Sequence, residues 1–196
     1  MLFQIQSNMK NTFTLLLILI LAAPCIAQGV FRNQTNNTLE KVVQDYPSQF
    51  KNIKGDQLSS RQGATDFKSN IGIPGAVSTT ITQTVAGEKQ LVSWQSVVFT
   101  TNEFSLARNR FEEMFNQIKN TIIRAQGEKA VIVNGMFINP LQDQTYTTIQ
   151  FDLLPPSGLM QKVNIDLVME NTGTQWEVVL SVHDKDRKNT GAIVIK

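Results

Sequence analysis

Alternation of apolar and polar residues in three late segments constrains the fold of this chain most strongly. Residues 145–154, 161–171 and 175–184 each place apolar side chains at every second position: Ile149, Phe151 and Leu153; Val163, Ile165, Leu167 and Met169; Trp176, Val178, Leu180 and Val182. Side chains two residues apart share one face of a strand, so each segment has one apolar and one polar face. That pattern is typical of antiparallel sheets, whereas buried parallel strands have continuous apolar runs.

Four further segments have strand-like composition. Residues 65–73, 76–85, 90–101 and 129–138 are rich in β-branched and aromatic residues and are separated by Gly- and Pro-containing turns. Residues 56–64 lack such a pattern and are predicted to form a loop.

One long amphipathic helix is predicted over residues 102–123. Its apolar residues recur at steps of three and four: Phe104, Ala107, Phe111, Met114, Phe115, Ile118 and Ile122. Side chains of this bulk need a broad apolar partner, so we expect the helix to cover the sheet.

A second helical pattern occupies residues 39–53, with Thr38 as its expected N-cap. Pro47 interrupts it, so either the helix kinks or it ends near Asp45 and a new turn begins with Pro47 near its first position.

These elements predict one α+β domain, residues 39–196, built as a two-layer sandwich in which two helices cover an antiparallel sheet. Residues 192–195 in the C-terminal tail are expected to add a short edge strand. Similar residues recur at offsets of 65 (Tyr46 and Phe111) and 68 (Thr79 and Thr147), which indicates a degenerate α-β-β-β repeat, although a chance likeness of such elements explains them equally well.

The first 27 residues resemble a signal peptide. Lys10 precedes an apolar run over residues 13–23, and residues 25–27 form a small-residue cleavage site. Cys25 leaves lipidation as an alternative, which Pro24 disfavours. Residues 28–38 are polar and aperiodic and are expected to form a tether.

Removing residues 1–27 leaves a mature chain with no cysteine and no integral membrane segment. One Lys is lost with them, so 18 basic residues become 17 against 16 acidic ones. A chain this close to neutral has no strong field, at the level of net charge, that favours nucleic acid or an anionic membrane.

We assign no catalytic, cofactor-binding or metal-ligating residue from the sequence. His183, the only histidine, is predicted to be an exposed residue at a strand end. Zinc is disfavoured, because one His and no mature Cys cannot build a three- or four-ligand site within one chain. Four acidic residues on the polar faces of neighbouring strands could form a row, which we interpret as a solvated surface: Asp152, Asp166, Glu170 and Glu177.

Several shorter patterns also fail as sites. The glycine turn of residues 72–75 lacks the features of a phosphate loop, the spacing of Asp184 and Asp186 departs from a calcium loop, and Lys185, Arg187 and Lys188 are too few for a nucleic-acid surface. Trp94 and Trp176 are interpreted as core residues. The two N-glycosylation patterns at Asn33 and Asn36 are interpreted as compositional accidents.

The segments DYPSQFKNIKG and SLARNRFEEMFNQIKNTI, behind a signal that begins MKN, resemble small secreted proteins of Bacteroidota-type bacteria. This resemblance carries no activity and implies a periplasmic or surface location.

The leading hypothesis is therefore an exported, non-enzymatic binding or interaction module of the cell envelope, with an unknown protein or small-molecule partner and no cofactor. The alternative is a small ligand carrier or enzyme with a cavity between the central helix and the sheet.

Overall fold

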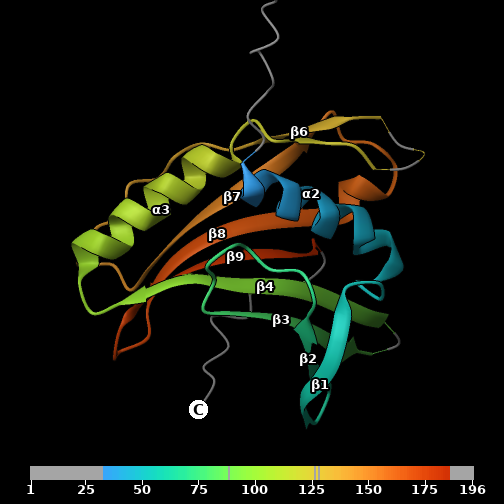
Figure 1. The fold of residues 1–196 in the computed structure, drawn as a ribbon, viewed down its shortest axis with the longest axis horizontal. Helices are drawn as coiled ribbons and strands as arrows, with labels where there is room; N and C mark the ends of the chain where they lie inside the picture. Colours follow the sequence, from blue (N-terminus) through green and yellow to red (C-terminus); the bar gives the residue numbers. More distant parts are fainter. Residues whose placement is uncertain (1–32, 88, 126, 128, 186–196) are drawn as a thin grey trace, which may run out of the picture. The chain divides into compact units, whose positions relative to one another are not determined.

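A computed structural model describes residues 33–185 except 88, 126 and 128 (Figure 1). The described residues from Asn33 onward form one compact unit. The described chain contains two α-helices and one nine-stranded antiparallel sheet, which confirms the predicted α+β class. None of the described helices has the length and apolar character needed to cross a membrane.

The elements follow one another in two runs of strands, each preceded by a helix. The first run is α2 (Gln34–Asp45), the 3-10 turn η1 (Tyr46–Ser48), β1 (Lys54–Arg61), β2 (Ala64–Ser69), β3 (Ser78–Ala86) and β4 (Lys89–Thr101). The second is α3 (Phe104–Ile118), β5 (Ile122–Ile123), β6 (Val131–Asn134), β7 (Tyr146–Leu154), the 3-10 turn η2 (Gly158–Lys162), β8 (Val163–Asn171) and β9 (Trp176–Asp184).

The two runs join at the centre of the sheet. The strand order is β1-β2-β3-β4-β9-β8-β7-β6-β5, so β4 and β9, the last strand of each run, lie side by side. Trp94 pairs with Val182 across this seam, and each run then proceeds outward as neighbouring antiparallel strands.

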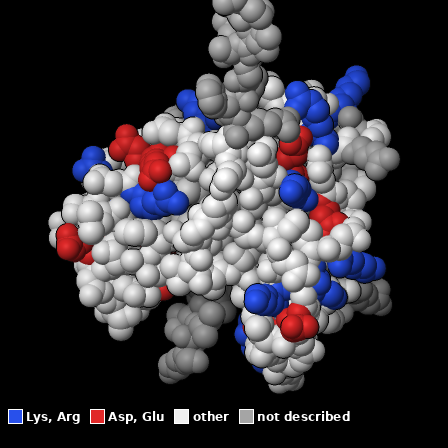
Figure 2. Space-filling view, in the orientation of Figure 1, with Lys and Arg blue, Asp and Glu red and all other residues white. Residues whose placement is uncertain are grey.

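Charged side chains lie toward the margins of the surface that Figure 2 displays, around a central area without charge. Lys and Arg groups and Asp and Glu groups are interspersed there, with no large area of a single sign. This distribution agrees with the near balance of acidic and basic residues in the sequence.

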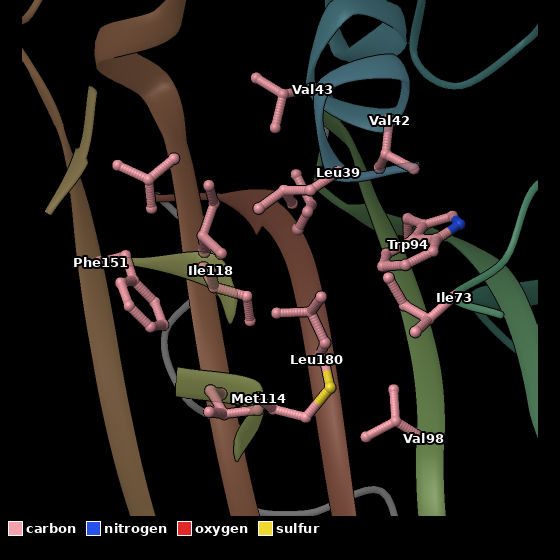
Figure 3. Close-up of a cluster of buried hydrophobic side chains, with 14 of the residues drawn as sticks. Leu39, Val42, Val43, Ile73, Trp94, Val98, Met114, Ile118, Phe151 and Leu180 are labelled. Atoms are coloured by element: carbon pink, nitrogen blue, oxygen red, sulfur yellow. The ribbon is translucent and has the colours of Figure 1, made fainter. Parts of the chain in front are cut away.

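The core lies between the helices and one face of the sheet. From α3, Met114 and Ile118 are fully buried and lie beside Leu180 of β9 (Figure 3). Helix α2 adds Leu39, Val42 and Val43 to the same cluster. Apart from Ile122, which is 41% exposed, the apolar residues predicted for the central helix and the late strands are therefore the ones that form or pack against the core.

Helix α2 begins earlier than predicted. We expected a tether up to residue 38 and a cap at Thr38, but the helix starts at Gln34 and Asn33 caps it by accepting a hydrogen bond from Asn36 N at 2.7 Å. Polar residues of this turn face inward, where the Thr35 hydroxyl donates to Gln117 Oε1 at 2.7 Å. The polar composition of residues 34–38 predicted a tether. These residues form a helical turn instead, because their side chains form hydrogen bonds with the rest of the domain.

The chain around Pro47 follows the second of the two predicted alternatives. The α-helix ends at Asp45, and Pro47 opens the turn η1 near its first position. Gln49 and Phe50 then adopt left-handed backbone angles, both with φ 57°, which direct the fully buried Phe50 ring into the core.

Two other boundaries differ from the prediction. Residues 56–64 were expected to form a loop, but most of them belong to strand β1, which is exposed at most positions and therefore has no apolar pattern to reveal it. The central helix ends at Ile118, not 123, because Asn120 turns the chain at φ 66° and Ile122–Ile123 form strand β5.

Candidate functional site

A buried polar cluster lies on the face of the sheet that points away from the helices. Its buried members are Asn164 and Asp166 of β8 and His183 of β9, and the exposed Gln150 of β7 borders them. The strand residues next to them in sequence, such as Ile165 and Val182, belong to the core. Asn164 lies directly opposite His183, and Gln150 lies directly opposite Asp166. Asn164, Asp166 and His183 are each at most 6% exposed.

Hydrogen bonds connect the whole polar cluster. His183 Nε2 lies 2.9 Å from Asp166 Oδ2, and His183 Nδ1 lies 2.9 Å from the carbonyl oxygen of Asp184. Asn164 Nδ2 donates to Asp166 Oδ1 at 2.8 Å, and Gln150 Nε2 donates to Asn164 Oδ1 at 2.6 Å. The cluster thus links three neighbouring strands through their side chains.

This geometry does not suit nucleophilic catalysis. A catalytic histidine needs one ring nitrogen directed at a hydroxyl or thiol and the other held by a carboxylate. Both nitrogens of His183 already have partners, namely a carboxylate and a main-chain carbonyl, so neither is directed at a nucleophile. Ser93 lies opposite His183 in the register of β4 and β9, but His183 is not placed to take its proton.

The prediction that His183 is exposed is wrong, since its exposed fraction is 6%. The alternation correctly placed it on the polar face of the last strand. Because β9 lies at the centre of nine strands, side chains of β4 and β8 flank this position on both sides. Sequence alone could not give strand order, so it could not reveal this burial.

The acidic row is divided by the structure. Asp166 belongs to the polar cluster, Asp152 is exposed on β7, and Glu170 lies directly opposite Glu177 across β8 and β9. Burial raises the pKa of Glu170, and the nearby charge of Glu177 raises it further. Within the described residues, no three His, Cys, Asp or Glu side chains are grouped to hold a metal ion.

A second carboxylate, Asp66 of β2, anchors the edge of the sheet. It accepts hydrogen bonds from Thr82 at 2.7 Å, from Ser59 at 2.8 Å and from Arg61 at 2.8 Å. Burial opposes ionisation and is the largest single effect on the Asp66 pKa, but these hydrogen bonds and the Arg61 charge together lower that pKa. The arrangement holds β1 to β2 and β3.

Both tryptophans fill space in the domain, which confirms their interpretation as core residues. Trp94 is fully buried, and its indole nitrogen donates to Ser69 Oγ and to the Ile71 carbonyl, both at 3.1 Å. Trp176 is 7% exposed and packs edge-on against Phe104, with ring centres 5.2 Å apart.

The remaining sequence candidates have structural roles or lie outside the described residues. Asp184 accepts hydrogen bonds from Tyr46 Oη and from Val92 N, and Ile73 in the glycine turn is buried. The first glycosylation pattern contains Asn33, the cap of α2. Asp186, Arg187, Lys188 and the expected strand 192–195 lie outside the described range.

A feature that we did not predict lies on the outer face of β5, β6 and β7. Ile122 pairs with Ile132, and Ile132 pairs with Leu154, so three aliphatic side chains stand in direct register; we call these three residues the apolar row. They are 41%, 46% and 42% exposed, whereas their neighbours Ile123, Val131, Val133 and Leu153 are buried in the core. The available signal was that consecutive residues, and so both faces, are apolar at Ile122–Ile123, at 131–133 and at 153–154.

Comparison with known proteins gives no relative for this chain: no family model, no curated protein and no solved structure matches it.

Proposed function

We propose that this chain is an exported, non-enzymatic binding module of the cell envelope, located in the periplasm or at the cell surface. In this proposal the apolar row is the part of the sheet that contacts a partner. The observation that carries it is the register of Ile122, Ile132 and Leu154, because contiguous exposed apolar side chains on a soluble domain mark interaction surfaces.

Exposing the aliphatic side chains of the apolar row to water costs free energy. The next outward residues on the same strands avoid this cost because they are polar. One position further along β6 and β7, the outward residues are Asn134 and Asp152, which pair with each other and are polar. Solvated antiparallel faces normally carry polar residues throughout. Three aliphatic residues in register at one end of such a face support a contact surface there.

The interior supports a binding module better than a carrier or an enzyme with an internal cavity. Such a cavity would need polar side chains directed inward, and Ser96 is one polar residue of the interior. Ser96 is fully buried and shares a hydrogen bond with Thr79 at 3.1 Å, so its polar atom is already satisfied. Large side chains such as Phe111 and Met114 fill the space beneath α3.

The same proposal includes the two-layer architecture and the degenerate repeat. Both helices contribute to one core against one sheet face, which supports two layers. Each run of strands continues outward in order from the seam between β4 and β9, with four strands on one side and five on the other, which supports a duplication of a helix followed by strands. The offset of 68 supports it less, because Thr79 lies in β3 beside the seam strand and Thr147 lies in β7, one strand further out.

Binding of the chain from Gln28 to Lys196 to isolated cell envelopes of its source organism tests this function. We expect the wild-type chain to sediment with the envelopes. The double variant Ile132→Thr, Leu154→Thr keeps strand-compatible residues but removes most of the apolar row, and we expect it to stay in the supernatant.

The matched control is Val77→Thr, Val85→Thr, which changes two residues that are 62% and 64% exposed elsewhere on the sheet. It should sediment like the wild type. The proposed function fails if the wild type does not sediment, or if both double variants sediment equally well.

A further inference from the structure

The apolar row is accompanied by basic residues. Arg124 follows Ile122–Ile123 directly, and Lys129 precedes β6 by two residues; both are exposed. At the other end, extending the β7–β8 register from the pair Phe151 and Ile165 by three residues brings Leu154 to the level of Lys162.

Lys185 adds to this basic end. Its backbone N–H donates to the Lys162 carbonyl at 2.8 Å, so the two residues are adjacent, and both are exposed. Among the described residues, none of these four basic side chains forms an ion pair with an acidic one.

Acidic residues offset this charge only in part. Asp152 is exposed on the same face of β7, two residues before Leu154, and Asp184 is engaged by Tyr46 and Val92 N. The connection between β5 and β6 also contains Glu128, which lies outside the described residues. The Glu40 carboxylate of α2 also lies beside this group, since Glu40 Oε1 accepts from Arg124 N at 3.0 Å. In the described part of the chain, the row therefore has four basic neighbours, one exposed acid on its own face and this buried carboxylate next to Arg124.

Further apolar residues continue from β6. Met136 and Ile138 lie in the segment after β6, which ends at Asn134, and are 82% and 49% exposed. The three aliphatic side chains of the row, with basic residues at both ends, fit a membrane surface, because apolar groups enter the boundary below the headgroups while Lys and Arg extend to anionic phosphates.

We propose that the apolar row and its four basic neighbours dock the domain on an anionic lipid surface. This inference rests on the proposed binding function and names its partner. A second protein chain fits less well, since stable protein interfaces take roughly 20–30 residues a side and their centres are depleted in Lys. A lipid surface needs neither a complementary shape nor specific partner residues.

Sedimentation with phospholipid vesicles tests the inference, using the chain from Gln28 to Lys196. We expect binding to vesicles of equal parts phosphatidylglycerol and phosphatidylcholine, and much weaker binding to phosphatidylcholine alone. The variant Ile132→Thr, Leu154→Thr should bind the anionic vesicles at least about tenfold more weakly, from the loss of two buried aliphatic groups. The Val77→Thr, Val85→Thr control should bind like the wild type.

Charge is tested separately with Arg124→Gln, Lys162→Gln. We expect about fivefold weaker binding for each basic residue removed, and no effect on the weak binding to phosphatidylcholine. Lys51→Gln, Lys68→Gln removes two exposed basic residues elsewhere and is the matched control. Thermal unfolding of each variant verifies that it is folded.

Two results would overturn the inference. One is an absence of vesicle binding, or binding that the row variant retains. The other is a concentration-dependent dimer in sedimentation velocity that the row variant abolishes while vesicle binding stays unchanged, which would assign the row to self-association. If envelopes bind through the row but vesicles do not, the lipid inference falls and the proposed function stands.

Discussion

Asp166 holds the polar cluster together, because one carboxylate oxygen faces His183 and the other accepts from Asn164. Asp166→Ala leaves both groups buried without this acceptor, at a cost of about 1–3 kcal/mol. Urea unfolding at neutral pH measures the loss. Asp152→Ala, on the exposed part of the same face, should change stability by less than about 0.5 kcal/mol. Equal effects of the two variants would show that the cluster does not stabilise the fold.

Glu170 makes stability depend on pH in a defined direction. Its pKa is raised by burial and by Glu177, so the folded chain holds this proton more tightly than the unfolded chain does. The associated stability is present below the ordinary pKa near 4.5 and is lost as pH rises through the folded-state pKa. The variant Glu170→Gln has no carboxyl group at this position, so it does not lose this stability as the pH rises.

We therefore expect Glu170→Gln to gain free energy of unfolding relative to the wild type between about pH 4 and about pH 7. Urea unfolding at both pH values gives the difference. In a Glu177→Gln background the gain should shrink, because one cause of the raised pKa is already gone. A difference between Glu170→Gln and the wild type that stays constant with pH contradicts the assignment.

At the level of single residues, the sequence indicated which face each side chain takes but not what it touches. Glu170 and Glu177 were both placed correctly on polar faces, yet their direct opposition depends on the register of β8 and β9. The bond between His183 and Asp166 depends on the same register. Register is fixed by turns and packing that one strand's alternation does not specify.

Among the elements, those with a regular apolar period were predictable. The late strands and the body of α3 match their predicted patterns, because burial of one face determines both the apolar period in the sequence and the element that forms. Strand β1 and the first turn of α2 have no such face. They are held by hydrogen bonds instead, β1 by pairing with β2 and by Asp66, and α2 by Asn33 and Thr35.

The start of α2 gives a direct test of that explanation. Asn33→Ala removes the side-chain oxygen that accepts from Asn36 N, and loss of an N-cap costs about 1 kcal/mol. Asn33→Asp keeps an acceptor and places a negative charge at the helix N-terminus, so it should retain most of the stability. Chemical denaturation compares the two. If both variants lose the same stability, the cap does not define this helix start.

For the whole molecule, the seam between β4 and β9 makes one sheet from two runs of strands. This order places β5, β6 and β7 at one end, where the outer face carries the apolar row, and places the polar cluster near the centre. The sequence predicted the α+β class but not this order, because alternation identifies strands without naming their neighbours. The candidate binding surface was missed for the same reason.

The central claim is that the molecule binds its partner through the β5–β7 end of the sheet. Hydrogen–deuterium exchange of the chain from Gln28 to Lys196, free and bound to isolated envelopes, tests it most directly. We expect binding to slow exchange in β5, β6 and the C-terminal half of β7, with β1–β3 unchanged. Protection confined to the helices or to the β1–β2 edge would contradict the claim.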